Sequence, residues 1–435
     1  MKTTAFKMTE LGPIPSDWEV KRLGNVATIA RGGSPRPIEA YLTTSPDGIN
    51  WVKIGDVGID AKYIVKTEER IVREGVCKSR MVFPGDFLLS NSMSFGRPYI
   101  LKIAGCIHDG WLVIQDYQSL FDSEFLYYIL GSETVMMQYK SLAAGSSVLN
   151  LNKDVVSNVL IPLPPLPEQH RIAAALSDMD ELIGALGKLV EKKRAIKTGA
   201  MQRLLTGQTR LPGFGGAELK QTELGPIPSD WEVKRLGEVF SMLRNNTYAR
   251  ELLTDDGGKV FNVHYGDILV KHGAMVNFEM DEVPCLKAGI KPNKDMLQDG
   301  DLIFADTAED EMVGKAVEVA GLKGRQAVAG LHTVLCRPNA DTFAPGFLGY
   351  FINSAAYHNQ LLPLITGTKV SSVSRAGFAS TYVCIPPLSE QRAIAAVLSD
   401  MDAEIAALEA EKHKVESIKQ GMMQELLTGR VRLMQ

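Results

Sequence analysis

The chain has 435 residues and a net charge of −4 at pH 7, with 45% hydrophobic and 23% charged residues. This length favours two or three domains, and the composition excludes disordered and fibrous proteins. An acidic chain is not a simple electrostatic binder of nucleic acid, so a DNA-binding role requires positive charge concentrated on one face or supplied by a partner. No apolar run approaches the roughly 18 residues of a membrane helix, and the first residues lack the apolar stretch of a signal peptide, so we expect a cytoplasmic protein.

The first element in chain order is a sixteen-residue box, TELGPIPSDWEVKRLG, at residues 9–24. The same sixteen residues occur again at 222–237, and an identical match of this length does not arise by chance. A second repeat pairs PPLPEQHRIAAALSDMD, from Pro164, with PPLSEQRAIAAVLSDMD, from Pro386, and continues to LLTGQTRL and LLTGRVRL. The chain therefore consists of two copies of one sequence repeat.

Between the repeated segments lie two bodies, residues 25–160 and 238–384, whose sequences diverge almost completely. Each body has short β-like runs followed by one predicted helix, at about 125–139 in the first and about 347–361 in the second. An enzyme would need the same reacting residues in both copies. A shared fold with divergent surfaces instead suits a fixed frame that carries two reading heads of different specificity.

A heptad pattern follows each body. In the first copy apolar residues alternate in steps of four and three, and the second copy repeats the pattern from Ile394. We predict two helices of about 38 residues, roughly 55–60 Å long, which end at Thr206-Gly207 and Thr428-Gly429. Such helices suit a spacer, and the duplication favours an antiparallel pair. The alternative is that each helix buries its apolar stripe on its own body.

The predicted boundaries follow from these segments: 1–160 for the first body with its box, 161–211 for the first long helix, 212–221 for a turn-rich linker, 222–384 for the second body with its box, and 385–435 for the second long helix. The predicted fold class is α/β and multidomain. Two globular domains are separated by a pair of long antiparallel coiled-coil helices, with a pseudo-twofold internal duplication.

The cysteines are widely spaced and form no C-x-x-C pair (Cys77, Cys106, Cys285, Cys336 and Cys384). This spacing indicates neither a zinc knuckle nor a disulfide framework, and we expect the cysteines to be small buried hydrophobic residues. His264, Asp267 and His272 match no standard metal-site spacing, so we interpret them as ordinary surface or strand residues. The sequence therefore predicts no metal bound by this chain.

The common enzyme motifs are missing. Gly314-Lys315 has no glycine five residues earlier and is followed by alanine, so there is no phosphate-binding P-loop. There is also no H-E-x-x-H zinc helix, no strand-flanked G-x-G-x-x-G turn and no G-x-S-x-G elbow. The sequence thus predicts a chain without catalytic activity of its own.

Two features keep a metal-dependent nuclease as an alternative. An acidic cluster would suit a two-metal site (Asp306, Glu309, Asp310 and Glu311), but the first copy has Asn91-Ser92-Met93-Ser94-Phe95 there, so a solvated loop is the simpler interpretation. Glu19-Val20-Lys21 has the E-x-K form of some nucleases, but no partner carboxylate is identifiable and the neighbouring Trp18 favours packing. A protein-binding scaffold is a further alternative of a different class.

Polar loops in both bodies suit DNA. Residues 31–37 offer two arginines, which can grip a phosphate or pair bidentately with guanine. The matching loop, 244–250, offers asparagine for adenine and tyrosine for the backbone or a thymine methyl group. For any single side chain, an ordinary solvated loop residue remains the alternative. The candidate DNA-binding residues are Arg31, Ser34, Arg36, Lys53, Asn91, Ser92, Ser94, Arg97, Ser146, Ser147, Arg244, Asn245, Asn246, Tyr248, Arg250, Lys271, Lys315, Thr368 and Lys369.

The segments PPLPEQHRIAAAL and PPLSEQRAIAAVL, each of which follows a divergent body and opens a long helix that ends in LLTG, resemble the specificity (S) subunit of type I restriction-modification systems. The resemblance covers the whole chain. It implies two target recognition domains, each reading one half of a bipartite site in double-stranded DNA. It also implies two modification subunits that methylate adenine N6 with S-adenosylmethionine, and restriction subunits that use ATP and Mg, so these cofactors are expected on the partners.

The same resemblance implies where the modification subunits dock. The helix-opening segments 164–180 and 386–402 match the family's pattern and are expected to lie in or near the docking surface. The candidate docking residues are Glu168, Gln169, Arg171, Glu390, Gln391 and Arg392.

Overall fold

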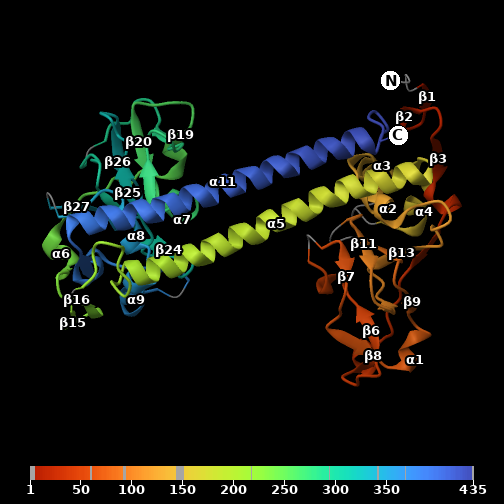
Figure 1. Ribbon diagram of the computed structural model, residues 1–435, viewed down its shortest axis with the longest axis horizontal. Helices are drawn as coiled ribbons and strands as arrows, with labels where there is room; N and C mark the ends of the chain where they lie inside the picture. Colours follow the sequence, from red (N-terminus) through yellow and green to blue (C-terminus); the bar gives the residue numbers. More distant parts are fainter. Residues whose placement is uncertain are drawn as a thin grey trace. The chain divides into compact units, whose positions relative to one another are not determined.

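The computed structural model describes residues 5–58, 61–91, 95–143, 151–216, 218–292, 294–339, 342–367 and 369–433 (Figure 1). The chain forms two compact units. Unit 1 comprises Met1–Gly187 and Ala410–Gln435, and unit 2 comprises Lys188–Glu409. Each unit therefore holds one body and a segment of both long helices, α5 (Leu166–Leu204) and α11 (Leu388–Leu426). In the described ranges, no helix has the length and apolar character needed to cross a membrane.

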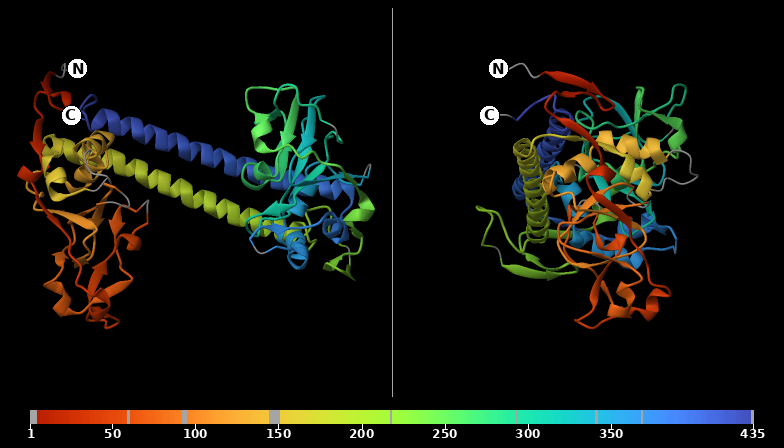
Figure 2. Two further views of the ribbon diagram at one scale, coloured as in Figure 1. Left: turned by 180° about the vertical axis from the view of Figure 1, so that it is seen from behind. Right: turned by 90° about the vertical axis from the view of Figure 1, so that its right-hand side faces the viewer.

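Unit 1 contains two five-stranded sheets. The first has the order β4-β13-β10-β11-β7 (Thr28–Arg31, Trp111–Gln115, Phe87–Ser90, Pro98–Leu101 and Tyr63–Ile64). The second has the order β5-β8-β6-β12-β9 (Leu42–Thr43, Glu69–Ile71, Ile49–Val52, Gly105–Ile107 and Arg80–Val82). The helical elements are η1, α1 to α4, η2 and η3 (Leu23–Asn25, Arg73–Val76, Ser123–Leu130, Glu133–Ala143, Lys153–Asn158, Ile38–Ala40 and Ile54–Asp56). Figures 1 and 2 show α2, α3 and α4 beside the start of α5, with the second sheet at the far end of this unit.

Unit 2 repeats this arrangement with other residues. Its main sheet has the order β18-β27-β23-β25-β21 (Phe240–Leu243, Thr333–Pro338, Leu302–Ala305, Ala316–Ala320 and Met275–Asn277). The second sheet has the order β19-β22-β20-β26 (Leu253–Thr254, Cys285–Leu286, Val260–Val263 and Gln326–Ala329), and β24 pairs with β28 (Thr307–Ala308 and Ser371–Ser372). The helical elements are α6 to α10, η4 and η5 (Leu236–Val239, Tyr265–Val270, Phe347–Ile352, Ala355–Leu361, Arg375–Ser380, Arg250–Leu252 and Leu362–Leu364). The predicted α/β class with two repeated domains is confirmed.

The repeated box forms the same small structure in each unit. In unit 1 it contains β2 (Gly12–Pro15), which forms a hairpin with β1 (Phe6–Thr9) at the start of the box, and then β3 (Glu19–Arg22), which pairs with β14 (Leu160–Leu163). In unit 2 the counterparts are β15 (Leu219–Thr222), β16 (Gly225–Pro228), and β17 (Glu232–Arg235) paired with β29 (Tyr382–Ile385). The box tryptophans, Trp18 and Trp231, are fully buried. The packing role predicted for Trp18 is confirmed, and Glu19 forms an exposed ion pair with Lys21.

The long helices end where a glycine is required. Gly207 has φ +70, and a side chain added there would meet Pro228 and Trp231 of the box in unit 2. Gly429 has φ +72 and meets Pro15 and Trp18 in the same way in unit 1. Only glycine adopts this left-handed conformation without strain while allowing such close approach. The predicted Thr-Gly ends are therefore confirmed, and each one locks a helix end onto a box.

Segments of the two long helices contact each other inside each unit. In unit 1 Lys419 of α11 donates to Asp180 of α5 at 2.6 Å. In unit 2 Lys193 of α5 pairs with Glu404 of α11 at 2.6 Å. The first turns of α5 also pack into the core of unit 1, where Leu176 is fully buried. The start of α5 thus buries part of its apolar stripe on its own body, and ion pairs join the two long helices within each unit.

Two details differ from the sequence prediction. The single helix predicted at 125–139 is two helices, α2 and α3, because the chain breaks at Gly131 and Ser132; the Ser132 hydroxyl accepts from the amide of Val135 at the start of α3. The second body has the same break between α8 and α9, where Ser354 caps α9. Of the cysteines, Cys77 is exposed and not buried, since it directly follows the short surface helix α1.

Candidate DNA interface

In unit 1 the loop after β4 lies against the turn 108–110 between β12 and β13. Arg31 Nε donates to the backbone oxygen of Asp109 at 2.9 Å, and Ser34 Oγ donates to its carboxylate at 2.7 Å. Arg36 reaches the same carboxylate at 3.3 Å and keeps 80% of its side chain exposed. Gly32 makes this approach possible, because a side chain there would collide with the backbone of His108. Asp109 therefore organises three predicted DNA-binding residues, Arg31 through its backbone oxygen and Ser34 and Arg36 through its carboxylate.

The surroundings of Asp109 favour the charged form of its carboxyl group. The hydrogen bond from Ser34 lowers the pKa of the carboxyl against the opposing effect of partial burial, and nearby His108 and Arg36 lower it further. Asn91, which follows β10, also reaches this turn, because its side-chain amide donates to the backbone oxygen of Asp109 at 3.3 Å. The end of the main sheet thus gathers two arginines, a serine and a carboxylate at one surface, while the Asn91 side chain that contacts the turn is buried.

The remaining candidates of unit 1 lie elsewhere or outside the described residues. Lys53 pairs with Glu69 at 2.7 Å on the second sheet. Arg97, directly before β11, lines a pocket of about 450 Å³ with Tyr127 and Met423. The others fall outside the described residues, together with one candidate of unit 2 (Ser92, Ser94, Ser146, Ser147 and Thr368).

Unit 2 builds its counterpart at the same sheet end. The Asn245 side-chain amide donates to the backbone oxygen of Gly330 at 3.0 Å, and the Asn246 backbone amide donates to Ala329 at 2.8 Å. These residues belong to the loop after β18, which contacts the turn 330–332 before β27. Asn246 is 1% exposed, so its side chain does not reach the surface. The loop position predicted from the sequence is repeated here, but with different side chains.

The other candidates on this loop are held by neighbouring groups. Arg244 lies 3.6 Å from the carboxylate of Asp295 and keeps 70% of its side chain exposed. Tyr248 donates its hydroxyl to the backbone oxygen of Lys291 at 2.8 Å. Arg250 pairs with Asp267 at 2.6 Å while more than half of its side chain stays exposed. Arg244 and Arg250 therefore keep guanidinium surface that a phosphate or base can reach.

The predicted DNA-binding lysines of unit 2 differ in how far neighbouring groups already hold their ammonium groups. Lys315 donates to the backbone oxygens of Leu269 and His272, at 2.9 and 2.8 Å, near the C-terminal end of α7, and burial lowers the pKa of its ammonium group. A cation at such a helix end stabilises the helix. Lys271 contacts the backbone oxygen of Glu282. Lys369 is exposed in the loop before β28. Lys369 is thus the lysine of this set best placed for a phosphate.

Sequence reasoning missed two residues of these clusters, Asp109 and His332. His332 ends the turn before β27 and lies 3.6 Å from the carboxylate of Asp306. The amide of Asp306 donates to the backbone oxygen of His332, as that of Asn91 does to Gly110 in unit 1. Both missed residues precede a strand that pairs with the strand leading into a predicted loop. This strand pairing is the signal that could have identified both residues, but its use requires the strand order of the sheet to be known.

The residues considered as metal ligands are not gathered into a site. Among the residues that the structure describes, no group of three or more histidine, cysteine or acidic side chains could hold a metal ion. His264 and His272 are buried, and burial lowers the pKa of both imidazoles. Glu309, Asp310 and Glu311 are exposed, as expected for a solvated loop.

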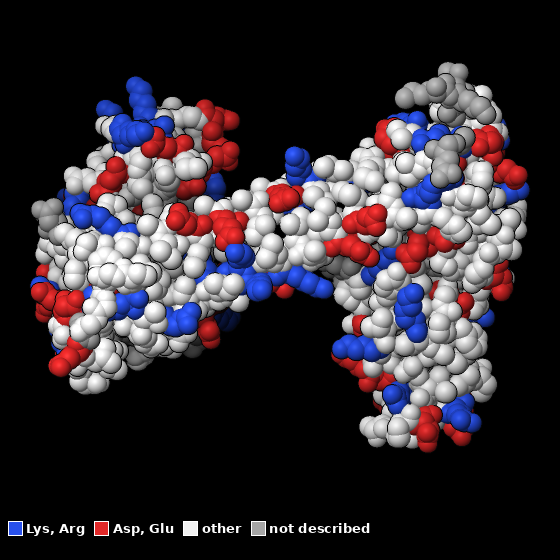
Figure 3. All heavy atoms as spheres, viewed as in Figure 1, with Lys and Arg blue, Asp and Glu red and all other residues white. Residues whose placement is uncertain are grey.

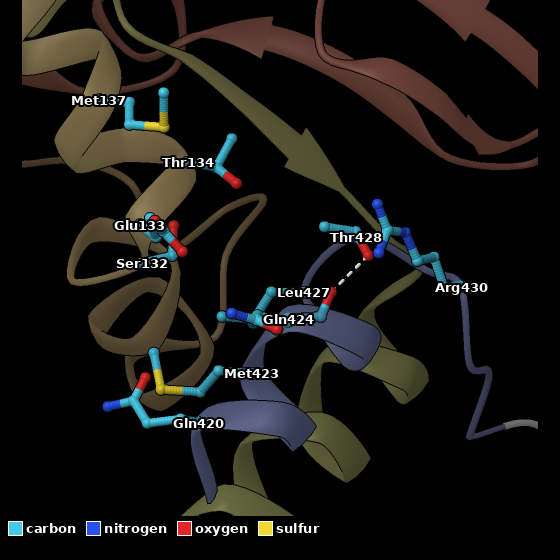
Figure 4. A pocket seen from close by; sticks show the side chains of 10 residues that line it. All are labelled: Ser132, Glu133, Thr134, Met137, Gln420, Met423, Gln424, Leu427, Thr428 and Arg430. Atoms are coloured by element: carbon cyan, nitrogen blue, oxygen red, sulfur yellow. Dashed lines mark hydrogen bonds between the residues drawn. The ribbon is translucent and has the colours of Figure 1, made fainter. Parts of the chain in front are cut away.

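A groove of about 330 Å³ lies between α3 and the end of α11 in unit 1. Figure 4 shows Met137 and Thr134 on one wall and Met423 and Gln424 on the other, with Thr428 bonded to the backbone of Gln424. The lining is mostly amide, hydroxyl and thioether groups. Such a surface suits contact with a polypeptide better than acid–base chemistry.

Four of the six candidate docking residues are buried and used inside the units. Glu168 accepts from the indole of Trp18 at 2.9 Å, and Gln169 accepts from the amide of Asp122 at 2.9 Å. Their counterparts, Glu390 and Gln391, make the equivalent bonds to Trp231 and Ala344. These four side chains join the box, the long helix and the body. Arg171 is half-buried and Arg392 is exposed.

Positive charge also gathers on the second half of α5. Figure 3 shows a run of Lys and Arg side chains along this part of the helix. The sequence there is KLVEKKRAIK, from Lys188 to Lys197. Lys188 and Lys192 are exposed. An acidic chain thus carries at least one local basic surface.

Comparison with known proteins decides the family. The model of the type I restriction modification DNA specificity domain matches the chain twice, at residues 15–193 and 228–417. The chain belongs to this family. Its members are the DNA specificity subunits of type I systems and not their catalytic subunits. The family assignment expected from the repeated PPLxEQ segments is confirmed.

The most similar relatives include two from Methanocaldococcus jannaschii. The type I restriction enzyme MjaVIII specificity subunit is 27% identical over 97% of this chain and 94% of its own length. The putative MjaX specificity subunit is 29% identical over 99% of this chain and 98% of its own. A solved chain from work on complex assembly in the type I restriction–modification system has a TM-score of 0.61 at 19% identity and covers 96% of this chain and 99% of its own. The fold is therefore that of specificity subunits.

Proposed function

We propose that this chain is the DNA-recognition subunit of a type I restriction–modification complex, in which each unit reads one half of a bipartite target. The supporting observation is the repeated use of one sheet end. In both units the loop after the first strand of the main sheet contacts the turn before the strand beside it. The side chains at this place differ between the units, as two different half-sites require.

The proposal extends to partners and cofactors. Two modification subunits with S-adenosylmethionine would methylate adenine N6, and restriction subunits would use ATP and Mg, all in the cytoplasm. Because Glu168 and Glu390 are buried, we propose that docking uses the surface around Arg171 and Arg392. We also propose that α5 and α11 pair as an antiparallel coiled coil that sets the gap between the half-sites. The ion pairs made by Asp180 and by Glu404 support this pairing.

The test of the function is methylation mapping. Coexpression with a cognate modification subunit is expected to place N6-methyladenine at one bipartite motif, read by long-read sequencing of the host DNA. Replacing residues 25–160 with the body of another specificity subunit is expected to change one half-site and leave the other and the gap intact. A motif without a gap, or methylation that does not depend on this chain, contradicts the proposal.

Lys369 gives a second measurable expectation. If it contacts a phosphate, Lys369→Ala weakens DNA binding of the assembled methyltransferase equally on target and non-target DNA, and the slope of log K against log salt falls by about 1. Lys220→Ala is the control, because Lys220 lies on β15, which pairs with β16 of the box, and donates to the backbone of Ser229. Titrations at several salt concentrations measure both slopes. An unchanged slope for Lys369→Ala would show that Lys369 does not contact a phosphate.

A further inference from the structure

His332 stands out by its backbone. In the described part of the chain, three residues other than glycine have a positive φ: Asp116, Lys323 and His332, the last at +52. A side chain in this left-handed region costs free energy that glycine avoids, and such strain often collects at functional sites. The equivalent turn of unit 1 has Gly110 at this place, directly before β13, and the φ of Gly110 is not positive. His332 therefore holds an imidazole in a left-handed conformation that the equivalent turn of unit 1 does not use.

The surroundings of His332 hold its ring but leave it accessible. Its side chain is 49% exposed, and Nδ1 lies 3.6 Å from a carboxylate oxygen of Asp306. The ring of Tyr265 meets the imidazole edge to face, with 5.3 Å between centroids. The Thr307 hydroxyl donates to the same Asp306 oxygen at 2.9 Å, which fixes the carboxylate. In the neutral tautomer that carries its hydrogen on Nδ1, which faces Asp306, Nε2 presents its lone pair and can accept a hydrogen bond.

The ring also lies at the end of the main sheet where unit 2 gathers its polar loops. The turn that carries His332 contains Gly330, which accepts from the Asn245 side chain at 3.0 Å. Thr307, the residue after Asp306, pairs with Ser372 of β28. This pairing brings β28, the strand that follows Lys369, to the same end of the main sheet. Figure 1 shows β26 and β27, which flank this turn, within unit 2.

We propose that His332 is a specificity-determining residue of unit 2, whose Nε2 accepts a hydrogen bond from the exocyclic amino group of an adenine or cytosine in the half-site. Asp306 and Tyr265 position the ring. The proposal rests on the proposed DNA-reading function and goes beyond it by naming the residue and the class of base edge. Adenine N6 and cytosine N4 are the amino donors of the major groove, so an acceptor discriminates them from guanine and thymine.

The test uses the assembled methyltransferase. His332→Gly removes the imidazole and also relieves the left-handed strain. We expect thermal stability to be equal or higher, while preference for the matched base over the others at one position of one half-site falls roughly 5- to 100-fold. His332→Asn tolerates the same backbone and keeps an acceptor oxygen, so it is expected to retain part of the preference. Lys323→Gly is the control, because it relieves similar strain in another turn and should leave the motif unchanged.

The outcomes separate this proposal from the function it rests on. If wild-type protein gives a bipartite motif and His332→Gly leaves every position of it unchanged, the role of His332 is wrong and the function stands. If His332→Gly lowers stability without changing the preference, His332 is structural and the proposal is overturned. A wild-type chain that directs no bipartite methylation overturns the proposed function itself.

Discussion

Arg432→Ala is expected to destabilise unit 1 by about 3–5 kcal/mol, the usual cost of removing one partner of a buried ion pair. The guanidinium contacts both oxygens of Glu168, at 2.6 and 2.7 Å, and both oxygens of Asp17, at 2.9 and 2.8 Å. Glu168 is 2% exposed, so the substitution leaves a carboxylate that water cannot solvate. The indole of Trp18 donates to the same carboxylate and would lose its fixed partner.

Hydrogen exchange and thermal unfolding measure this loss. Faster exchange is expected in unit 1 and not in unit 2. The matched control is Arg430→Ala, because Arg430 is 64% exposed and lies 3.7 Å from Glu425, a contact that contributes about 1 kcal/mol or less. If Arg432→Ala unfolds no earlier than Arg430→Ala, the buried ion pair does not stabilise unit 1. Arg210→Ala is expected to produce the same effect in unit 2, since it pairs with Glu390 and Asp230.

The pH dependence of this cluster has a defined sign. The hydrogen bond from Arg432 lowers the pKa of Asp17. A carboxyl whose pKa is lower in the folded state stabilises the protein above its unfolded pKa, and this contribution disappears as the pH falls through the lowered value. Arg432→Ala is therefore expected to flatten the acid limb of the stability curve.

Asp109→Ala is expected to weaken binding of the assembled methyltransferase to its target by roughly 30- to 150-fold, which corresponds to about 2–3 kcal/mol. The substitution releases Ser34 and Arg36, which both donate to this carboxylate, and leaves the loop after β4 without its side-chain anchor. Binding to non-target DNA should change much less, because that affinity comes from phosphate contacts. Equilibrium titration on target and non-target duplexes measures both.

Asp109→Asn separates geometry from charge. The asparagine oxygen can still accept from Ser34, but the negative charge that attracts Arg36 is lost. An intermediate loss of affinity is expected. Unchanged discrimination by Asp109→Ala in a folded complex would mean that the loop after β4 does not depend on this carboxylate.

The frame could be predicted from the sequence because repetition and periodicity are local signals. The identical boxes, the heptad steps and the Thr-Gly ends lie in continuous segments, and the structure has them at the expected places. The break between α2 and α3 was missed because the apolar pattern of residues 125–139 continues on both sides of Gly131 and Ser132 and so looks like one helix. The strand order was not predictable, since each sheet joins strands that are far apart in the chain.

The candidate sites depend on that strand order. Asp109 meets the loop after β4 only because β13 pairs with β4, and His332 meets its loop only because β27 pairs with β18. Glu168 has the sequence character of a surface residue at a helix start. It is buried because Arg432, from the far end of the chain, neutralises it. Long-range partners of this kind leave no mark in the neighbouring sequence.

The chain segments that form each unit determine the order in which synthesis completes the units: unit 2 is complete before unit 1. Unit 2 spans one continuous stretch, Lys188–Glu409, whereas unit 1 joins Met1–Gly187 to Ala410–Gln435. The core of unit 1 includes Leu426 and Leu427, and its buried carboxylate waits for Arg432. On the ribosome, the half whose residues emerge first is thus the last to close. Until residues 426–432 have been synthesised, the core of unit 1 lacks Leu426 and Leu427, and the buried Glu168 lacks Arg432.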